Sequence, residues 1–192
     1  MIEIKPCATL DIVNMYCEVS ATAVDTFDPR RVATPAEAME VSAFLLQPGT
    51  FGTPLTPGER DEFQTRPAAS IGLPHETYWY LRDQHRAIAT VLGVRMHANR
   101  TGIFEISALA VHASCRRRGL GRRLLQFALQ FVATTKGRGL IFETSSDDAY
   151  KPMRSLLAAL EFTQVGTFPE FYYPGEDTLW YYRPIDRLFT GF

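Results

Sequence analysis

The sequence predicts a mixed α/β protein in which helices pack on a mixed sheet of about seven strands. The chain has 192 residues, of which 46% are hydrophobic and 21% charged, as in an ordinary globular domain with a real core. Stretches typical of strands alternate along it with stretches whose apolar residues recur at helical spacing. Their order is β-α-α-β-β-β-α-β-α-β-β, which is typical of a mixed sheet covered by helices.

The first part of the chain predicts one strand and two helices. The strand is expected at residues 2–5 and the first helix at residues 10–24. A second helix begins after Thr34, because Thr34 can cap it and Glu37 completes a capping-box pattern three residues later. This second helix is expected to end at about Leu46.

The segment 48–74 interrupts the regular pattern with five prolines and four glycines. Proline and glycine at this density break helices and strands. The segment is too long to be a simple connection, so we expect a functional loop or lid, a disordered segment or a solvated surface excursion. We treat it as a loop or insertion within a single domain, 1–192.

The remainder of the chain supplies most of the sheet. Its best-defined helix carries a continuous apolar stripe from Leu120 to Val132. The expected elements, in order, are a hairpin of strands at 77–81 and 87–96, a strand at 103–111, a helix at 120–135, a strand at 140–143, a helix at 152–160, and strands at 165–172 and 179–183.

Charge and cysteine usage narrow the class of protein. The formal net charge is -1, which does not favour nucleic acid or a membrane surface as a partner. Cys7, Cys17 and Cys115 are irregularly spaced, as reduced thiols of a cytoplasmic protein are. His112 lies near Cys115 but no second ligand pair follows, so no metal site is expected. There is no signal-peptide pattern and no apolar run of the ~18 residues that a membrane helix needs.

An arginine- and glycine-rich motif lies between the strand that ends at Val111 and the helix that begins near Leu120. It reads Arg116-Arg117-Arg118-Gly119-Leu120-Gly121. Such a turn points backbone N–H groups outward at a helix N-terminus, where the helix dipole adds partial positive charge. Glycine lets a ligand approach the backbone closely. Five arginines within 116–123 add charge, so the motif predicts a pocket for a pyrophosphate.

Three interpretations of this motif compete. It can be a basic helix start that is merely solvated. It can be a dinucleotide site, because Gly119-x-Gly121 begins a G-x-G-x-x-G pattern and Glu143 follows. That interpretation fails because Leu124 occupies the third glycine position and seven residues separate the preceding strand from the first glycine. The third interpretation is the coenzyme A loop of an acyltransferase.

The spacing Arg116-x-x-Gly119-x-Gly121 resembles the Arg/Gln-x-x-Gly-x-Gly/Ala signature of the GNAT superfamily of N-acetyltransferases. The strand 105–111 is similar to the one that pairs with the pantetheine arm, and 140–144 to the one that splays away from it. The resemblance covers about 78–184. It implies a largely antiparallel sheet and transfer of an acyl group, with acetyl expected, from coenzyme A to an amine.

The resemblance also implies which residues hold acetyl-CoA. Backbone N–H groups of the loop bind the pyrophosphate, Arg116 shapes or contacts the loop, and the strand pairs with the pantetheine amides. No metal takes part. The implied residues are Leu109, Ala110, Val111, Arg116, Arg117, Arg118, Gly119, Leu120, Gly121 and Arg122.

Glu105 is the candidate general base. Strand alternation places it on one face with Ser107, Leu109 and Val111, whereas residues 104, 106, 108 and 110 take the other face. Partial desolvation of a carboxylate on a central strand favours such a role. The alternative is a structural glutamate bonded to a neighbouring strand or loop.

The usual proton donor of the family is a tyrosine, and Leu157 occupies its position here. Three explanations stay open. The thiolate leaves unassisted, which a thiol pKa near ~8.5 permits. Another hydroxyl substitutes, with Tyr150, Ser155 and Tyr173 as candidates, although Tyr150 can equally be a packing residue. Otherwise the chain keeps the fold and binds coenzyme A or a partner without catalysis.

The acceptor is expected to be an amine of a small molecule or a protein. In the family the loop between the last two strands often lines the acceptor site, which makes Phe171, Tyr172 and Glu176 candidates; aromatic residues in strands are more often core. The resemblance is compatible with a homodimer. A nucleic-acid-binding module built on the arginines is the remaining alternative, and the chain offers it no second basic patch.

Overall fold

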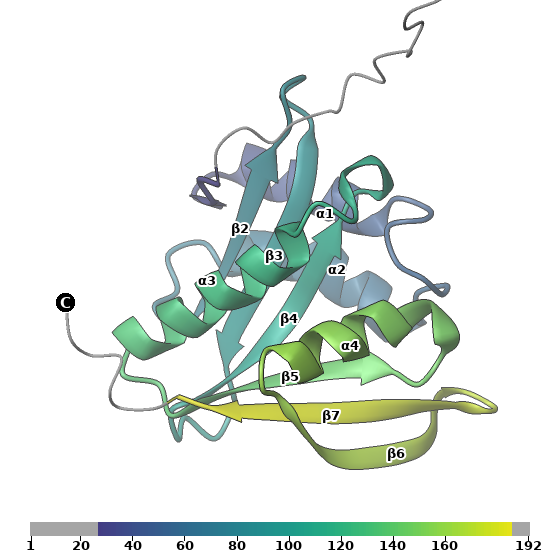
Figure 1. The fold of residues 1–192 in the computed structure, drawn as a ribbon. Coiled ribbons are helices and arrows are strands. Elements are labelled where there is room, and N and C mark those ends of the chain that lie inside the picture. Colours follow the sequence, from purple (N-terminus) through teal and green to yellow (C-terminus); the bar gives the residue numbers. More distant parts are fainter. Residues whose placement is uncertain (1–26, 186–192) are drawn as a thin grey trace, which may run out of the picture.

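The computed structural model describes residues 27–185, which are organised around one sheet of seven strands (Figure 1). The order across the sheet is β1-β2-β3-β4-β5-β7-β6, and only β4 and β5 are parallel neighbours. The strands are β1 (Arg30–Arg31), β2 (Glu76–Arg82), β3 (Ile88–Met96), β4 (Ile103–Val111), β5 (Gly139–Ser145), β6 (Thr163–Tyr173) and β7 (Glu176–Pro184). The predicted mixed, largely antiparallel sheet is confirmed; the strand and helix expected at 2–5 and 10–24 lie outside the described residues.

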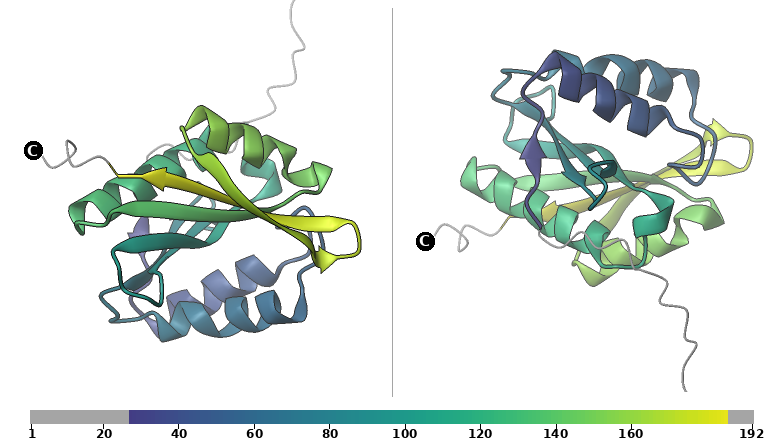
Figure 2. Two further views of the ribbon diagram at one scale, coloured as in Figure 1. Left: turned by 90° about the horizontal axis from the view of Figure 1, so that it is seen from below. Right: turned by 90° about the horizontal axis from the view of Figure 1, so that it is seen from above.

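Two pairs of helices cover the two faces of the sheet (Figure 2). Helices α1 (Pro35–Leu46) and α2 (Pro57–Ala69) lie on one face, and α3 (Leu120–Thr134) and α4 (Lys151–Ala159) lie on the other. Each face has its own core. Val41 and Phe63 are buried against the first face, and Leu124 and Leu157 against the second. Each such side chain contributes roughly 1.5–3 kcal/mol of burial free energy.

Helix α1 begins as the sequence predicts. The Thr34 side chain accepts a hydrogen bond from the Glu37 N–H at 3.3 Å, and the Glu37 carboxylate accepts from the Thr34 N–H at 3.0 Å. The Tyr80 hydroxyl donates to the same carboxylate at 2.8 Å, which ties the helix start to β2. The backbone N–H of Ala33 is the main cause that lowers the pKa of Glu37 to about 2.

Helix α2 lies inside the segment 48–74, so the expectation of a loop was wrong for 57–69. Two of the prolines that suggested a loop are part of the helix. Pro57 sits in the first turn, where a missing N–H costs nothing, and Pro67 lies near the end. A second capping box, made by Thr56 and Glu59, fixes the start. This helix adds Glu59 and Glu62 to the face of the sheet described below.

Strands β4 and β5 pair for only three residues and then part. The paired residues are 103–105 of β4 and 139–141 of β5. Beyond Glu105 the edge of β4 that faces β5 has no strand partner, while its other edge stays paired with β3 up to Val111. The splay expected from the family resemblance is therefore present, and it leaves a strand edge open in the middle of the sheet.

A bulge in β4 reverses the side-chain alternation. Ile106 pairs with Val94 and Ala108 pairs with Gly93, so Ser107 has no partner in β3. Before the bulge Phe104 belongs to the core under α3; after it Ala108 joins the core under α1 and α2. The predicted common face of residues 105, 107, 109 and 111 was wrong beyond Ser107, because an extra residue shifts a period of two by one.

Candidate functional site

The open edge of β4 presents backbone groups of two residues. The His112 N–H donates to the Ala89 carbonyl of β3 at 2.8 Å. In an antiparallel pair the direction of the N–H and C=O groups alternates, so Ala110 bonds toward β3 whereas Leu109 and Val111 face the open edge. Of the three strand residues predicted to contact coenzyme A, Leu109 and Val111 can therefore offer backbone hydrogen bonds, and Ala110 cannot.

The predicted loop joins this edge to the start of α3. A 3-10 turn at Ala113–Cys115 leads into residues that alternate between extended and left-handed backbone, with φ of 65° at Arg117 and 77° at Gly119. Gly119 occupies the N-cap position of α3 and supplies no side-chain cap. A left-handed φ favours glycine at this position, which accounts for the first glycine of the motif.

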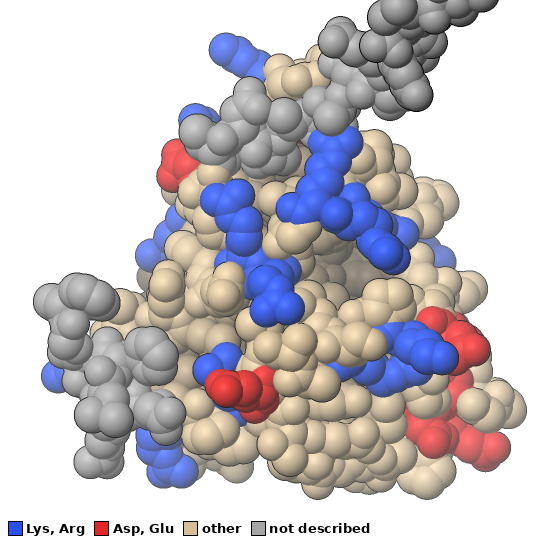
Figure 3. Space-filling model, viewed as in Figure 1, with Lys and Arg blue, Asp and Glu red and all other residues tan. Residues whose placement is uncertain are grey.

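Six consecutive backbone N–H groups, from Arg117 to Arg122, form no hydrogen bond within residues 27–185. The first intrahelical bond of α3 runs from the Arg123 N–H to the Gly119 carbonyl at 3.1 Å. Exposed arginines surround these donors, and Figure 3 shows basic side chains gathered over the start of α3 beside a hollow in the surface. Free donors at the positive end of a helix, with added positive charge, suit a phosphate group.

Arg116 acts inside the protein. Its guanidinium donates to the carbonyl of Val111 at 3.0 Å, and to those of Gly49 and Thr50 at 3.0 and 2.8 Å. The side chain thereby ties the loop to the end of β4 and to the segment after α1. These bonds to backbone carbonyls fit the first of its two predicted roles, which is to shape the loop.

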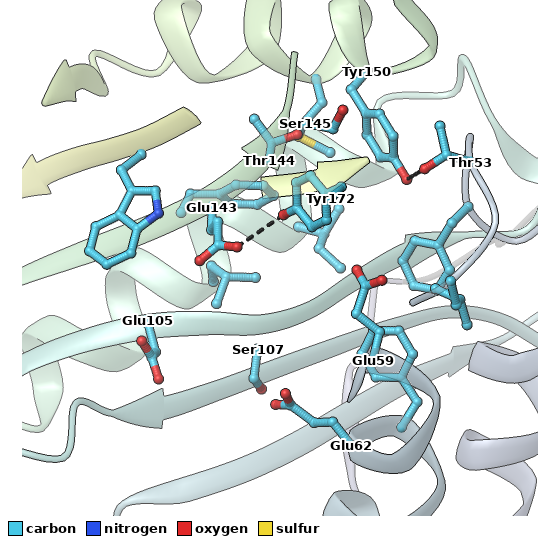
Figure 4. A pocket seen from close by; sticks show the side chains of 18 of the residues that line it. Thr53, Glu59, Glu62, Glu105, Ser107, Glu143, Thr144, Ser145, Tyr150 and Tyr172 are labelled. Carbon is cyan, nitrogen blue, oxygen red and sulfur yellow. Dashed lines mark hydrogen bonds between the residues drawn. The ribbon is translucent and has the colours of Figure 1, made fainter. Parts of the chain in front are cut away.

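A cavity of about 220 Å³ lies where β4 and β5 part (Figure 4). Its walls come mainly from the segment before α2, α2 itself, β4, β5 and the β6–β7 hairpin, and Arg95 of β3, Tyr150 and Met153 of α4 complete them. Glu59 and Glu62 project from α2 toward the strands that carry Ser107 and Glu143. Leu109, at the open edge of β4, also lines it, so the cavity and the open edge are continuous.

Glu105 lines this cavity and lies next to other charged side chains. Its carboxylate pairs with the Arg95 guanidinium, which also contacts Glu62 at 2.6 Å. The three side chains form a chain from β4 across β3 to α2. Both readings of Glu105 have support here, because it lines the cavity and is bonded to a neighbouring strand.

The tyrosines predicted near the site lie at the cavity. The Tyr150 hydroxyl is 3.2 Å from the Thr53 hydroxyl, and the Tyr172 hydroxyl donates to Glu143 at 2.9 Å. Burial is the main cause that raises the pKa of Tyr172, so this phenol stays protonated at neutral pH. Tyr173 lines the cavity as well.

Of four other residues considered from the sequence, one lines the cavity and three do not. Glu176 lines the cavity and accepts a hydrogen bond from the Ser145 hydroxyl at 2.6 Å. Phe171 is 56% exposed and does not line it. Ser155 is exposed on α4, and Leu157 is fully buried in the core. Leu157 is therefore a packing residue of α4.

Sequence reasoning missed Glu59, Glu62, Thr53 and Glu143 as wall residues. Glu143 was considered only as the acidic residue of a dinucleotide motif. For Glu59 a signal existed, because Thr56 and Glu59 form a capping-box pattern that predicts a helix there. Nothing local in the sequence predicts that α2 turns two carboxylates toward β4.

Two kinds of feature are absent from the part of the chain that the structure describes. None of the helices between residues 27 and 185 combines the length and the apolarity needed to cross a membrane. In the same part of the chain, no group of three His, Cys, Asp or Glu side chains is arranged so that it could hold a metal ion.

The chain resembles known proteins at two levels, a family profile and the fold. The profile of the Acetyltransferase (GNAT) family matches residues 45–160, more than half of the chain. No curated protein matches the chain in sequence. A GNAT-family protein from Desulfovibrio desulfuricans superposes with a TM-score of 0.70 at 24% identity, over 83% of this chain and 99% of that chain.

Two further solved structures share the fold at lower identity. The ribosomal-protein-S18-alanine N-acetyltransferase from Escherichia coli has a TM-score of 0.64 at 16% identity, over 83% of this chain and 95% of its own. A protein assigned as streptothricin acetyltransferase from Bacillus anthracis, solved with acetyl coenzyme A, has a TM-score of 0.55 at 19% identity, over 62% of this chain and 68% of its own.

Proposed function

Because the chain belongs to the GNAT family of acetyltransferases, we propose that it transfers acetyl from acetyl-CoA to a primary amine of a small molecule or a protein. The transfer takes place by direct attack of the amine in a ternary complex. The names of its fold relatives cover acceptors of both kinds, a ribosomal protein in one case and streptothricin in the other. The proposal takes 1–192 as one cytoplasmic acyltransferase domain, with a homodimer as a compatible assembly.

One observation carries the proposal. The unpaired edge of β4 runs from a helix start with six free N–H groups to a cavity lined by carboxylates and hydroxyls. An extended ligand with a phosphate group at one end and a reactive group at the other matches this layout. Coenzyme A thioesters have that construction.

The donor is held mainly by backbone. N–H groups from Arg117 to Arg122, including those of Gly119 and Gly121, bind the pyrophosphate, and the dipole of α3 favours its negative charge. Leu109 and Val111 pair with the pantetheine amides as an added strand does. The thioester then lies at the splay, beside the cavity.

The chemistry needs a neutral amine, a stabilised oxyanion and a leaving thiolate. Glu105 takes a proton from the acceptor ammonium, and the amine nitrogen attacks the thioester carbonyl carbon. The C–N bond forms, the C–S bond breaks, and the thiolate of coenzyme A leaves. Tyr150, whose hydroxyl lies at the cavity wall, donates the proton that the thiolate takes up. As the amide forms, the nitrogen releases its second proton, which restores the Tyr150 phenol through solvent, and Glu105 returns the first proton to solvent.

The donor site is tested by calorimetric titration with acetyl-CoA, comparing Gly121→Asp with Gly121→Ala. A Cβ at Gly121 meets only Leu156, at an ordinary 3.5 Å, so the folded loop has room for the Cβ that both variants add. Aspartate in the first turn of α3 repels a pyrophosphate, whereas alanine adds only a methyl group. We expect micromolar binding by the parent, a loss of at least tenfold in Gly121→Asp, and a change of less than threefold in Gly121→Ala.

The thermal midpoints of both variants are measured alongside, to separate lost binding from lost structure. Equal weakening in the two variants would indicate a steric effect without a pyrophosphate site. No binding by the parent would overturn the proposal, and binding without turnover of any amine would favour the catalytically inactive alternative.

A further inference from the structure

We propose that the acceptor is a small polycationic amine with at least two ammonium groups. One ammonium loses its proton and reacts, while another is held by the carboxylates of Glu59, Glu143 and Glu176. This inference rests on the proposed function, because it takes the cavity at the splay to be the acceptor site. The cavity is identified by the parting of β4 and β5, independently of its charge.

The cavity wall is strongly acidic in a chain that is nearly neutral overall. Five glutamates line it, together with a single basic residue, Arg95. Arg95 is already bound by Glu105 and Glu62. The wall therefore has a formal charge of -4, while the whole chain has a formal charge of -1.

The other three glutamates have no cationic partner among residues 27–185. Each is positioned by neutral donors instead. Glu59 accepts from the Thr56 backbone and hydroxyl, Glu143 from the Tyr172 hydroxyl, and Glu176 from the Ser145 hydroxyl. These bonds orient the carboxylates, and the start of α2 partly offsets the charge of Glu59, but no cation neutralises any of the three. A cationic ligand is therefore the complement that the wall lacks.

Aromatic rings complete a wall suited to ammonium groups. Phe51 and Phe63 stack at 5.2 Å between ring centroids on the α2 side, and Tyr172 and Trp180 lie on the opposite side. Ring faces attract ammonium ions, and they also cover the methylene segments between two charged ends.

The same wall disfavours two other classes of ligand. The phosphates of coenzyme A are repelled by it and directed to the arginine-rich loop. An amine whose far end is a carboxylate meets uncompensated negative charge, so a free amino acid is a poor acceptor. Protein amines close to acidic side chains are disfavoured in the same way.

Three acceptors of one chain length separate these possibilities: cadaverine, pentylamine and aminovalerate. They share a primary amine on five carbons and differ at the far end, which is cationic, neutral or anionic. We expect kcat/KM with acetyl-CoA to be at least tenfold higher for cadaverine than for pentylamine, and lowest for aminovalerate. Calorimetry without acetyl-CoA should detect binding of cadaverine and no binding of pentylamine or aminovalerate.

The combined variant Glu59→Gln, Glu143→Gln, Glu176→Gln removes three charges and keeps an oxygen for each local hydrogen bond. Glutamine also serves in a capping box, so α2 keeps its start. We expect it to reduce the preference for cadaverine over pentylamine at least tenfold. Asp61→Asn, on an exposed position of the same helix, is the matched control and should leave the preference within twofold.

The outcomes distinguish this inference from the proposed function. Acetylation of pentylamine as efficiently as cadaverine, or an unchanged preference in the combined variant, would overturn the inference and leave the acetyltransferase intact. If no amine is acetylated, the proposed function fails. Calorimetry then still tests whether the cavity binds a polycationic amine. Cadaverine binding that is lost in the combined variant would support this inference. Absence of cadaverine binding to the parent would refute it.

Discussion

The charged neighbours of Glu105 become known only from the folded structure. The sequence places it on a central strand, and the structure adds Arg95 and Glu62 to its surroundings. The Arg95 guanidinium binds Oε1 of this carboxylate, so Oε2 is the oxygen left to accept a proton. Its role as the general base therefore has to be measured, as the loss of kcat when the carboxylate is removed.

Glu105→Gln tests that role. Glutamine can still accept the hydrogen bond from Arg95, so the local packing is preserved. We expect kcat to fall ~10²–10⁴-fold, the range of general-base catalysis, with the KM for acetyl-CoA unchanged. The parent's loss of kcat at acidic pH, which a titrating base produces, should be absent from the variant.

The pH profile is the decisive readout, because a structural role lowers activity at every pH alike. An acidic limb that persists unchanged in Glu105→Gln would assign the proton transfer to another group. Glu143 is the next carboxylate to consider, since it lies on β5 across the splay and has no cationic partner among residues 27–185.

Among single residues, those with a local signature were predictable and those placed by tertiary packing were not. Gly119 is recognisable because a left-handed turn at a helix start needs glycine. Arg116 belongs to the same motif, yet its bonds to Gly49 and Thr50 span more than 60 residues and have no sequence signal. Leu157 stands where the family usually has a tyrosine, and the structure shows that it is a fully buried core residue.

At the level of elements, helix and strand positions were predictable wherever a cap or a period marks them. The strand 103–111 and the start of α3 at Leu120 agree with the structure to the residue. The bulge at Ser107 was not predictable, because it exists only in the pairing of β4 with β3. A Cβ at Gly93 would lie 2.5 Å from the Ser107 hydroxyl and 2.7 Å from the Tyr78 ring, so β3 is fitted to the bulge by a glycine.

The start of α1 supports a prediction about acid stability. The pKa of Glu37 is lowered from 4.5 to about 2 in the folded protein, chiefly by the Ala33 N–H and then by the Tyr80 hydroxyl. A lowered pKa means that the ionised group stabilises the fold above pH 4.5. That contribution is lost as the pH falls through the window from about 4.5 to about 2.

Glu37→Gln keeps a hydrogen-bond acceptor in the capping box but cannot ionise. We expect it to lower the free energy of unfolding by about 1 kcal/mol at neutral pH, the usual difference between hydrogen bonds to a charged and to a neutral acceptor. The difference from the parent should shrink as the pH is lowered from 5 toward the folded pKa of about 2. Urea unfolding at a series of pH values measures it, and a difference that stays constant down to pH 3 would contradict this account.

On the scale of the whole molecule, charge is segregated while the total is nearly zero. Arginines gather at the start of α3, and glutamates line the cavity at the splay. The composition alone suggested a protein without a strong electrostatic preference. The segregation was not predictable from the sequence, because the five glutamates come from three strands and a helix that only the fold brings together.

This segregation bears on the order of chemical events. Two oppositely charged sites, joined by the open edge of β4, allow the donor and a cationic acceptor to bind together, with the thioester and the amine meeting at the splay. Direct transfer then needs both ligands present, whereas a covalent acyl-enzyme would let coenzyme A leave before the acceptor binds.

Initial rates measured over a grid of acetyl-CoA and cadaverine concentrations separate the two routes. For direct transfer we expect double-reciprocal lines that intersect, and coenzyme A that inhibits competitively against acetyl-CoA. Pentylamine, run as the matched acceptor without the second charge, should give the same intersecting pattern with a higher KM, because the second ammonium affects binding and not the route. Parallel lines, together with release of coenzyme A from acetyl-CoA in the absence of any amine, would instead place the acetyl group on a side chain of the cavity. Ser107 and Ser145 would then be the hydroxyls to replace first, since both line it.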